Sequence, residues 1–387
     1  MRAVVELGDV ARFFNGFAFD SKKFNLDKKG LPLVRIRDVV RGFSETYYFG
    51  QYQESFLINN GDLLVGMDGE FNLAYWKGGK ALLNQRVCKV ETNPGLLYRP
   101  YLKFLLEPLL KVIESNTAFV TVKHLSTEDL KTQAIPLPSL ERQKEIAHQL
   151  ERADRLRRLR SYALEVSDRY LQGVFLELFG DPLSNPKGWD KSELGEEIDG
   201  FEGGVNFPPI AEGQSASEWR VLKISAVTWG TFNADESKPI TPDTKFSDSI
   251  VVKRGDLLFS RANTTELVGA VSLVRYTPKK VLLPDKIWRV KLEESGRLHP
   301  EFLLEYLRHP HIRGIMSDLA SGSGGSMKNI SMEKAKTIPV PLPPLELQTH
   351  FADIVQKHER VRRMQLEALR QAELLYGTLL ARAFGEG

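Results

Sequence analysis

One segment of about 45 residues occurs twice in this chain. Residues 135–180 and 340–385 align at a constant offset of 205 without a gap, and the two copies begin IPLPSLERQ and VPLPPLELQ. The identities are too many for chance, so the chain contains an internal repeat. In the first copy the repeated residues include Pro136, Leu137, Pro138, Leu140, Glu141, Gln143, Arg155, Arg157, Arg158, Phe179 and Gly180.

Each copy predicts a long amphipathic helix. The Pro-x-Pro opening blocks any helix upstream and sets an extended entry, and a glycine ends the segment. Apolar residues return every three or four positions, and about 40 helical residues would span roughly 60 Å. The apolar stripe suits a partner helix better than a globular core, so we expect the two helices to pack as an antiparallel coiled coil. In the first copy the stripe comprises Ile146, Leu150, Ala153, Leu156, Ala163, Val166, Tyr170 and Val174.

The segments that precede the two copies also match each other. RVLKISAVTWG from Arg220 follows the pattern of LVRIRDVVRG from Leu33, and RGDLLFS from Arg254 follows NGDLLVG from Asn60. Strand-like runs, together with a helix at about 98–114, predict a mixed α/β (α+β) domain before each long helix. The sequence therefore predicts a tandem repeat with pseudo-twofold symmetry. Its parts are a domain at 1–134, a central helix at 135–181, a second domain at 189–338 and a C-terminal helix at 339–387.

Composition limits the classes of protein to consider. The 387 residues are 42% apolar, with a net charge of only +3, so any nucleic-acid binding must come from clustered charges. The start lacks the apolar region of a signal peptide, and no apolar run approaches a membrane span, so we expect a cytoplasmic protein without a membrane partner. Cys88 is the only cysteine and is predicted to be a buried small hydrophobic residue.

Motifs for catalysis or metal binding are missing. The glycine-rich stretch SGSGGSMK from Ser321 lacks the Gly-Lys-Ser/Thr of a phosphate-binding loop, and it is interpreted as a flexible loop that either contacts DNA or is a plain linker. FEGGVNFPPI from Phe201 is interpreted as a loop, because its glycines and prolines are adjacent rather than on separate strands. No HExxH occurs among the seven histidines. The sequence therefore predicts neither catalytic residues nor a metal site.

These features together resemble the specificity subunit of Type I restriction-modification enzymes. The resemblance covers essentially the whole chain, and it rests on the two Pro-Leu-Pro-x-Leu-Glu-x-Gln openings with their helices, the GDLL turns at Gly61 and Gly255, and GSGGSMKNIS from Gly322. The first copy of this last loop, NTAFVTVKHLS from Asn116, lacks the glycines, so its backbone would approach DNA differently.

The resemblance implies a noncatalytic subunit that directs DNA methylation and restriction. Two target-recognition domains would each bind one part of a split double-stranded DNA sequence, with the helices as spacer. Two methyltransferase (M) subunits and restriction/translocase (R) subunits would dock on it. S-adenosylmethionine, ATP and magnesium would belong to these partner subunits, with no cofactor bound by this chain.

Side chains at strand ends and in polar loops are the candidates for DNA contact, because Arg and Lys read guanine, Asn and Gln read adenine, and charges hold phosphates. For each of them a solvated surface position is an equal alternative. Arg35 and Arg37 are predicted to share a strand face opposite Val34 and Ile36. The candidates are Arg35, Arg37, Arg41, Asn84, Gln85, Arg86, Lys123 and His124 in the first domain, and Arg220, Lys223, Trp229, Arg261, Asn263, Thr264, Lys286, Lys328 and Asn329 in the second.

Two alternatives remain open from the sequence. One is a coiled-coil scaffold or assembly protein without sequence-specific DNA binding, and the other is a self-sufficient DNA enzyme with unfamiliar motifs. The basic run from Arg152 to Arg160 is explained equally well by solubility, by spacer phosphates or by acidic patches on a partner.

Overall fold

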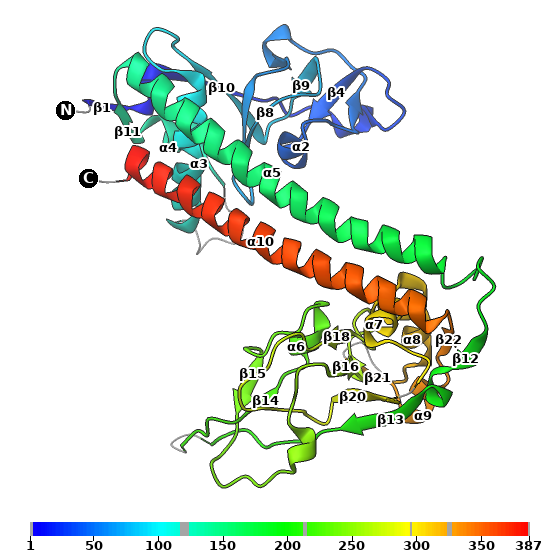
Figure 1. Ribbon diagram of the computed structural model, residues 1–387. Coiled ribbons are helices and arrows are strands. Elements are labelled where there is room, and N and C mark those ends of the chain that lie inside the picture. Colours follow the sequence, from blue (N-terminus) through cyan, green and yellow to red (C-terminus); the bar gives the residue numbers. More distant parts are fainter. Residues whose placement is uncertain (1–2, 117–123, 212–214, 295, 323–326, 386–387) are drawn as a thin grey trace. The chain divides into compact units, whose positions relative to one another are not determined.

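A computed structural model describes residues 3–116, 124–211, 215–294, 296–322 and 327–385 (Figure 1). The chain divides into two compact units. Unit 1 comprises Met1–Tyr162 and Leu366–Gly387, and unit 2 comprises Ala163–Gln365. Each unit contains one half of each long helix. The predicted domain ranges, which treat the helices as separate parts, stay predictions.

The two long helices are α5, Leu140–Phe179, and α10, Leu345–Phe384, with 40 residues each. In unit 1 the guanidinium of Arg157 lies 4.2 Å from the ring centroid of Tyr376, and in unit 2 Arg362 Nε donates to Asp168 Oδ1 at 2.8 Å. Within unit 2, Ser167 Oγ lies 2.9 Å from His358 Nε2 and the ring of Phe175 packs against that of Phe351, so the α10 partner moves backward as the α5 residue advances. The helix segments run antiparallel in this unit, Figure 1 shows the same direction in unit 1, and the predicted antiparallel pair is confirmed.

Extended segments lead into both helices, as the Pro-x-Pro openings predicted. Strand β11, Ala134–Leu137, pairs antiparallel with β1, Ala3–Glu6. Strand β22, Pro339–Pro341, pairs in the same way with β12, Lys191–Glu193. Each unit thus joins its first strand to the residues just before a long helix.

A buried glutamine anchors the first turn of each helix to its own unit. Gln143 is fully buried, and its Nε2 donates to the carbonyls of Leu96 at 2.9 Å and Pro138 at 2.8 Å, while its Oε1 accepts from Tyr98 N at 2.8 Å. Gln348 makes the same three bonds in unit 2, to Arg297, Pro343 and His299. These bonds explain why glutamine recurs at this position of the repeat.

The remaining strands of unit 1 form a four-stranded and a five-stranded sheet. The strands are β2 Ala11–Asn15, β3 Phe24–Asn25, β4 Leu31–Val34, β5 Tyr47–Tyr48, β6 Leu57–Ile58, β7 Leu63–Gly66, β8 Leu73–Tyr75, β9 Ala81–Leu83 and β10 Val87–Thr92. The four-stranded sheet has the order β2-β10-β7-β8, and the five-stranded sheet has the order β3-β5-β4-β9-β6.

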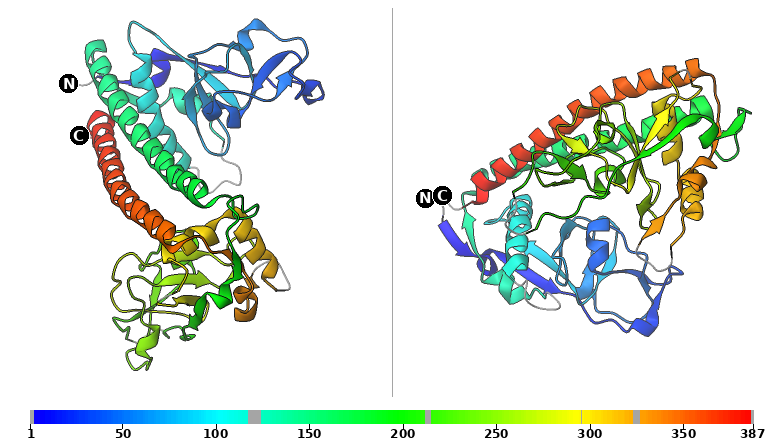
Figure 2. Two further views of the ribbon diagram at one scale, coloured as in Figure 1. Left: turned by 45° about the vertical axis from the view of Figure 1, so that its right-hand side comes forward. Right: turned by 90° about the horizontal axis from the view of Figure 1, so that it is seen from below.

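The shorter helices of unit 1 are α1 Leu7–Val10, α2 Ile36–Arg41, α3 Arg99–Asn116 and α4 Thr127–Lys131. The predicted helix at about 98–114 is confirmed as α3, whose buried face includes Leu102 and Leu106. In Figure 2, α3 lies along the first half of α5, and Ile146 and Leu150 of α5 belong to the same core cluster. The long helix therefore completes the core of unit 1.

Unit 2 repeats this plan. Its strands after β12 are β13 Ile198–Gly203, β14 Arg220–Leu222, β15 Ser237–Pro239, β16 Leu257–Ser260, β17 Ala262–Asn263, β18 Val271–Leu273, β19 Val281–Leu282, β20 Ile287–Leu292 and β21 Lys328–Asn329. Its shorter helices are α6 Ser225–Thr228, α7 Pro300–Arg308, α8 Pro310–Leu319 and α9 Met332–Lys336. The sheet β13-β20-β16-β18 corresponds strand for strand to β2-β10-β7-β8 in unit 1. The predicted tandem repeat is confirmed by this sheet, whereas the second sheet has five strands in unit 1 and three, β15-β14-β19, in unit 2.

The repeated GDLL turns have a structural role. Gly61 and Gly255 have φ of +89° and +95°, where glycine carries no steric penalty. Asp62 Oδ2 accepts from Asn59 N at 2.8 Å, and Asp256 Oδ2 accepts from Lys253 N at 2.7 Å. The Gly-Asp pair therefore closes the turn that starts β7 and β16.

Strands β9 and β10 are separated by a turn at 84–86, and α4 and β11 lie between α3 and α5. One local prediction needs correction. The apolar stripe of α5 is buried at Ile146, whereas Val166 and Tyr170 are 44% and 58% exposed. Helical periodicity locates a stripe, but it does not show how far the partner surface extends along it.

Cys88 is fully buried in the core of unit 1, as predicted, and burial raises the pKa of its thiol to about 12. None of the helices in the described part of the chain has the length and apolar character needed to cross a membrane.

Candidate nucleic-acid interface

Three chain segments meet at one end of the β7–β10 pair in unit 1. Met67, which follows β7, donates its N–H to the carbonyl of Arg86 at 3.0 Å, and Leu125 donates to the carbonyl of Met67 at 2.8 Å. The turn before β10, the end of β7 and the segment before α4 are thus held together by backbone bonds. This convergence brings four predicted residues into one surface, called the first cluster: Asn84, Gln85, Arg86 and His124.

Asp68, which no sequence pattern indicated, organises the first cluster. Arg86 Nη1 lies 3.0 Å from Asp68 Oδ2, and His124 Nδ1 lies 2.6 Å from Asp68 Oδ1. The Asp68 side chain is only 18% exposed, whereas those of Arg86 and His124 are 49% and 54% exposed. One carboxylate therefore positions two nitrogen-bearing side chains whose outer donors face solvent.

The same three segments meet in unit 2. Arg261 donates its N–H to the carbonyl of Lys286 at 3.1 Å, and Ile330 donates to the carbonyl of Arg261 at 2.9 Å. Strand β17 pairs with β21 directly beside these bonds. Six predicted residues come together as the second cluster: Arg261, Asn263, Thr264, Lys286, Lys328 and Asn329.

The side chains of the second cluster are arranged differently. Arg261 Nε donates to the carbonyl of Asp285 at 2.8 Å, and its guanidinium lies 5.8 Å from the ring centroid of Trp288. Asn263 Nδ2 donates to Thr228 Oγ1 at the end of α6, at 3.2 Å. The cation is thus held by Asp285, whose carboxylate also lies 3.9 Å from Arg261 Nη2, and by Trp288 of β20, rather than by a residue at the position of Asp68. The same arrangement of three hydrogen-bonded backbone segments therefore carries different side-chain donors and acceptors in the two units.

The strand-face prediction for Arg35 and Arg37 is wrong. Strand β4 ends at Val34, Arg35 is the N-cap of α2, and Arg37 lies within that helix. The side chain of Asp38 accepts from Arg35 N at 3.0 Å, which stabilises a helix start where the alternation suggested a strand. Asp38 is 1% exposed, and burial raises the pKa of its carboxyl.

The other predicted residues lie outside the two clusters. Arg220 donates from Nε and Nη2 to Oγ and O of Ser237, both at 2.8 Å, so its guanidinium is bound within unit 2. Lys223 Nζ lies 4.0 Å from Glu236 Oε2, whereas Trp229, after α6, is 74% exposed. Arg41 ends α2 and is exposed. Lys123 lies outside the described residues.

Comparisons with known proteins agree with this duplicated architecture. The family model described as the Type I restriction modification DNA specificity domain matches residues 2–164 and 217–375. The Type I restriction enzyme EcoBI specificity subunit of Escherichia coli is 28% identical over 410 residues, which cover 98% of this chain and 85% of that protein. The MjaVIII specificity subunit of Methanocaldococcus jannaschii is 23% identical over 335 residues, with 82% and 77% covered.

Two solved structures share the fold. The S subunit of a Type I restriction-modification system from M. genitalium has a TM-score of 0.59 at 15% identity, covering 100% of this chain and 96% of that one. A chain from a study of complex assembly and conformational transition of the type I R-M system has a TM-score of 0.56 at 20% identity, covering 98% and 97%. The family model matches most of the chain, once in each half. The chain therefore belongs to the family of Type I restriction-modification specificity subunits, which are noncatalytic.

Proposed function

We propose that this chain recognises a split double-stranded DNA target, one part through the first cluster and the other through the second. The observation that carries the proposal is that the same three backbone segments meet in both units and carry different side chains in each. Base edges in the major groove are told apart by their donor and acceptor patterns, so different side chains on the same backbone arrangement would select different half-sites. The long helices would set the spacer between them.

The proposal includes the partners of the assembly. Two methyltransferase (M) subunits would modify adenine in the target, and restriction/translocase (R) subunits would act on unmodified DNA. S-adenosylmethionine, ATP and magnesium would be bound by those subunits. The exposed apolar side chains on the long helices, such as Leu159 and Met364 at 54% and 65%, offer surface that a protein partner could cover.

The deciding experiment is a genome-wide map of methylated adenine in the source cell, with and without an in-frame deletion of this gene. We expect one split motif to lose its methylation, which would give both half-sites and the spacer at once. If no motif changes while the methyltransferase partner is expressed, the scaffold alternative replaces this proposal.

Replacing Arg86 is a finer test of the first cluster. We expect Arg86→Ala to weaken binding by about 1–3 kcal/mol and to relax selectivity at one base of one half-site, because an arginine that contacts guanine provides two donors. The measurement is binding of the reconstituted complex to duplexes with single base changes. Arg12→Ala removes an equal charge from the exposed surface of β2 and serves as the control. A uniform loss at all sequences would assign Arg86 to a phosphate instead.

A further inference from the structure

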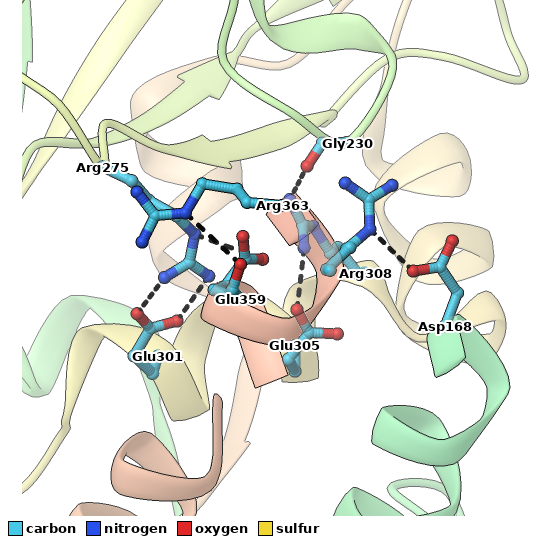
Figure 3. A network of polar contacts seen from close by, with 9 residues as sticks. Asp168, Gly230, Arg275, Glu301, Glu305, Arg308, Glu359 and Arg363 are labelled. Atoms are coloured by element: carbon cyan, nitrogen blue, oxygen red, sulfur yellow. Dashed lines mark hydrogen bonds and ion pairs between the residues drawn. The ribbon is translucent and has the colours of Figure 1, made fainter. Parts of the chain in front are cut away.

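Unit 2 has a hollow rich in arginine that the proposed base-reading clusters do not use. The cavity, of about 820 Å³, lies between loops of the recognition domain, α7 and the nearby halves of the two long helices (Figure 3). We call it the arginine pocket, after the five arginines that line it: Arg254, Arg275, Arg308, Arg362 and Arg363.

Carboxylates neutralise three of these arginines. Arg275 Nη2 donates to Glu301 Oε2 at 2.8 Å, and Arg275 Nε lies 3.7 Å from Glu359 Oε1. Arg308 Nη1 lies 2.7 Å from Glu305 Oε1 and also donates to the carbonyl of Gly230. Arg362 is paired with Asp168, as described above. Each acidic residue that lines the pocket already has an arginine partner.

The other two arginines have no carboxylate partner among the described residues. Arg363 donates only to the backbone carbonyl of Glu359, at 3.4 Å, and Figure 3 shows its guanidinium above that residue. Arg254 has neither an ion pair nor a hydrogen bond within the described part of the chain, and both arginines are exposed. Together with Glu301, the pocket has five arginines and four carboxylates, and its two exposed arginines would attract an anion.

The chemistry of the pocket suits a nucleic-acid phosphate. A guanidinium binds phosphate through two parallel N–H donors, and a nearby aromatic ring packs against a sugar or base. Trp229 and Tyr276 line the same hollow and are 74% and 47% exposed. Trp229 follows α6 directly, and Thr228 of α6 accepts the bond from Asn263. The rim of the pocket is thus continuous with the second cluster.

Unit 1 has the corresponding hollow, of about 760 Å³. Arg41, which ends α2, and Gly42, which follows it, line the hollow much as Trp229 and Gly230 after α6 line the arginine pocket of unit 2. Arg158 lines it from α5 and corresponds to Arg363 in the sequence repeat. Among its cations, Arg41, Lys77, Lys111 and Arg155 have no ion pair within the described residues. The surplus of positive charge is therefore a feature of both units.

We propose that the arginine pocket binds backbone phosphates of the DNA beside the bases read by the second cluster, with Arg254 and Arg363 as the phosphate ligands. This inference rests on the proposed function. In unit 1 the counterpart of Arg363, Arg158, is paired with Asp154 at 2.9 Å, so the cations without an ion pair in that hollow lie at other positions.

The test uses the complex of the full chain with its methyltransferase partner and a duplex that carries the mapped motif. We expect the double variant Arg254→Gln, Arg363→Gln to lower the slope of log affinity against log salt by about 2, since each lost phosphate contact contributes roughly 0.9. Raising the salt concentration from about 50 to about 200 mM would therefore weaken DNA binding by the variant complex about tenfold less than binding by the unmodified complex. The methylated motif should not change, because phosphate contacts carry no base information.

Lys187→Gln with Lys191→Gln is the matched control, because it removes two exposed positive charges of unit 2 that do not line the pocket. An equal fall in slope in this control would show a general charge effect and overturn the proposal. An unchanged slope in the arginine variant would also overturn it, and loss of the methyltransferase from that variant would assign the pocket to an acidic protein surface. If the unmodified complex shows no motif-specific binding, the proposed function itself fails.

Discussion

Exchange of residues 1–134 for the first domain of a related specificity subunit is expected to change one half of the methylated motif and to leave the other half and the spacer unaltered. The first cluster lies entirely within the exchanged part. Each mismatched base pair costs about 1–3 kcal/mol, so several changed positions in the half-site would abolish methylation of the original motif. The measurement is a map of methylated adenine in cells that express the chimera with its methyltransferase.

The way that unit 1 joins α5 makes this exchange feasible. Strand β1 pairs with β11 through backbone atoms, and Gln143 binds the carbonyl of Leu96 and the N–H of Tyr98. Backbone partners are available whatever side chains the donor domain carries. A junction at Ile135 therefore keeps the helix and its glutamine while the reading surface changes.

The reciprocal exchange of residues 189–338 is the control for modularity. It should alter the half of the motif that the first chimera preserved. A change of both halves in either chimera would contradict separate reading by the two clusters. An unchanged motif in both chimeras would show that the bases are read elsewhere.

The long helices and the duplication could be predicted from the sequence because both depend on local rules. Proline is disfavoured in a helix interior, glycine commonly ends a helix in the left-handed conformation, and apolar periodicity marks a face. Gly180, with φ of +81°, follows α5 as these rules predict. Strand alternation misplaced Arg35 and Arg37, because alternation over a few positions also fits a short helix, here capped by the bond from Arg35 N to Asp38 and by Gly42.

The first cluster was predicted in part. Asn84, Gln85 and Arg86 were identified because they are side-chain types that read bases and were placed at a strand end or in a polar loop. Asp68 was not, because its role depends on His124, which lies 56 residues away and reaches it only through the bonds around Met67. No local pattern distinguishes such a carboxylate from a solvated one. Side chains that act by joining distant segments need the tertiary structure to be found.

Gln143 also joins distant segments, and its replacement should lower the stability of unit 1 more than any other substitution proposed for it. Gln143→Met keeps the approximate volume but leaves Tyr98 N and the carbonyls of Leu96 and Pro138 without their buried partner. An unsatisfied buried polar group costs about 1–3 kcal/mol, so we expect the free energy of unfolding of unit 1 to fall by roughly 2–5 kcal/mol. The midpoint of denaturant unfolding measures the change.

Cys88 gives a second measurement that is specific to unit 1. It is the only cysteine and is fully buried, and burial raises the pKa of its thiol to about 12, so alkylation requires unit 1 to open. A loss of about 3 kcal/mol would speed alkylation roughly 100-fold, since each 1.4 kcal/mol corresponds to a factor of ten. Gln133→Met is the control, because within the described part of the chain the Gln133 side chain donates only one, solvent-exposed bond, to the carbonyl of Asp129 at 2.7 Å. Equal alkylation rates in the two variants would show that the repeated glutamine does not hold the helix to its unit.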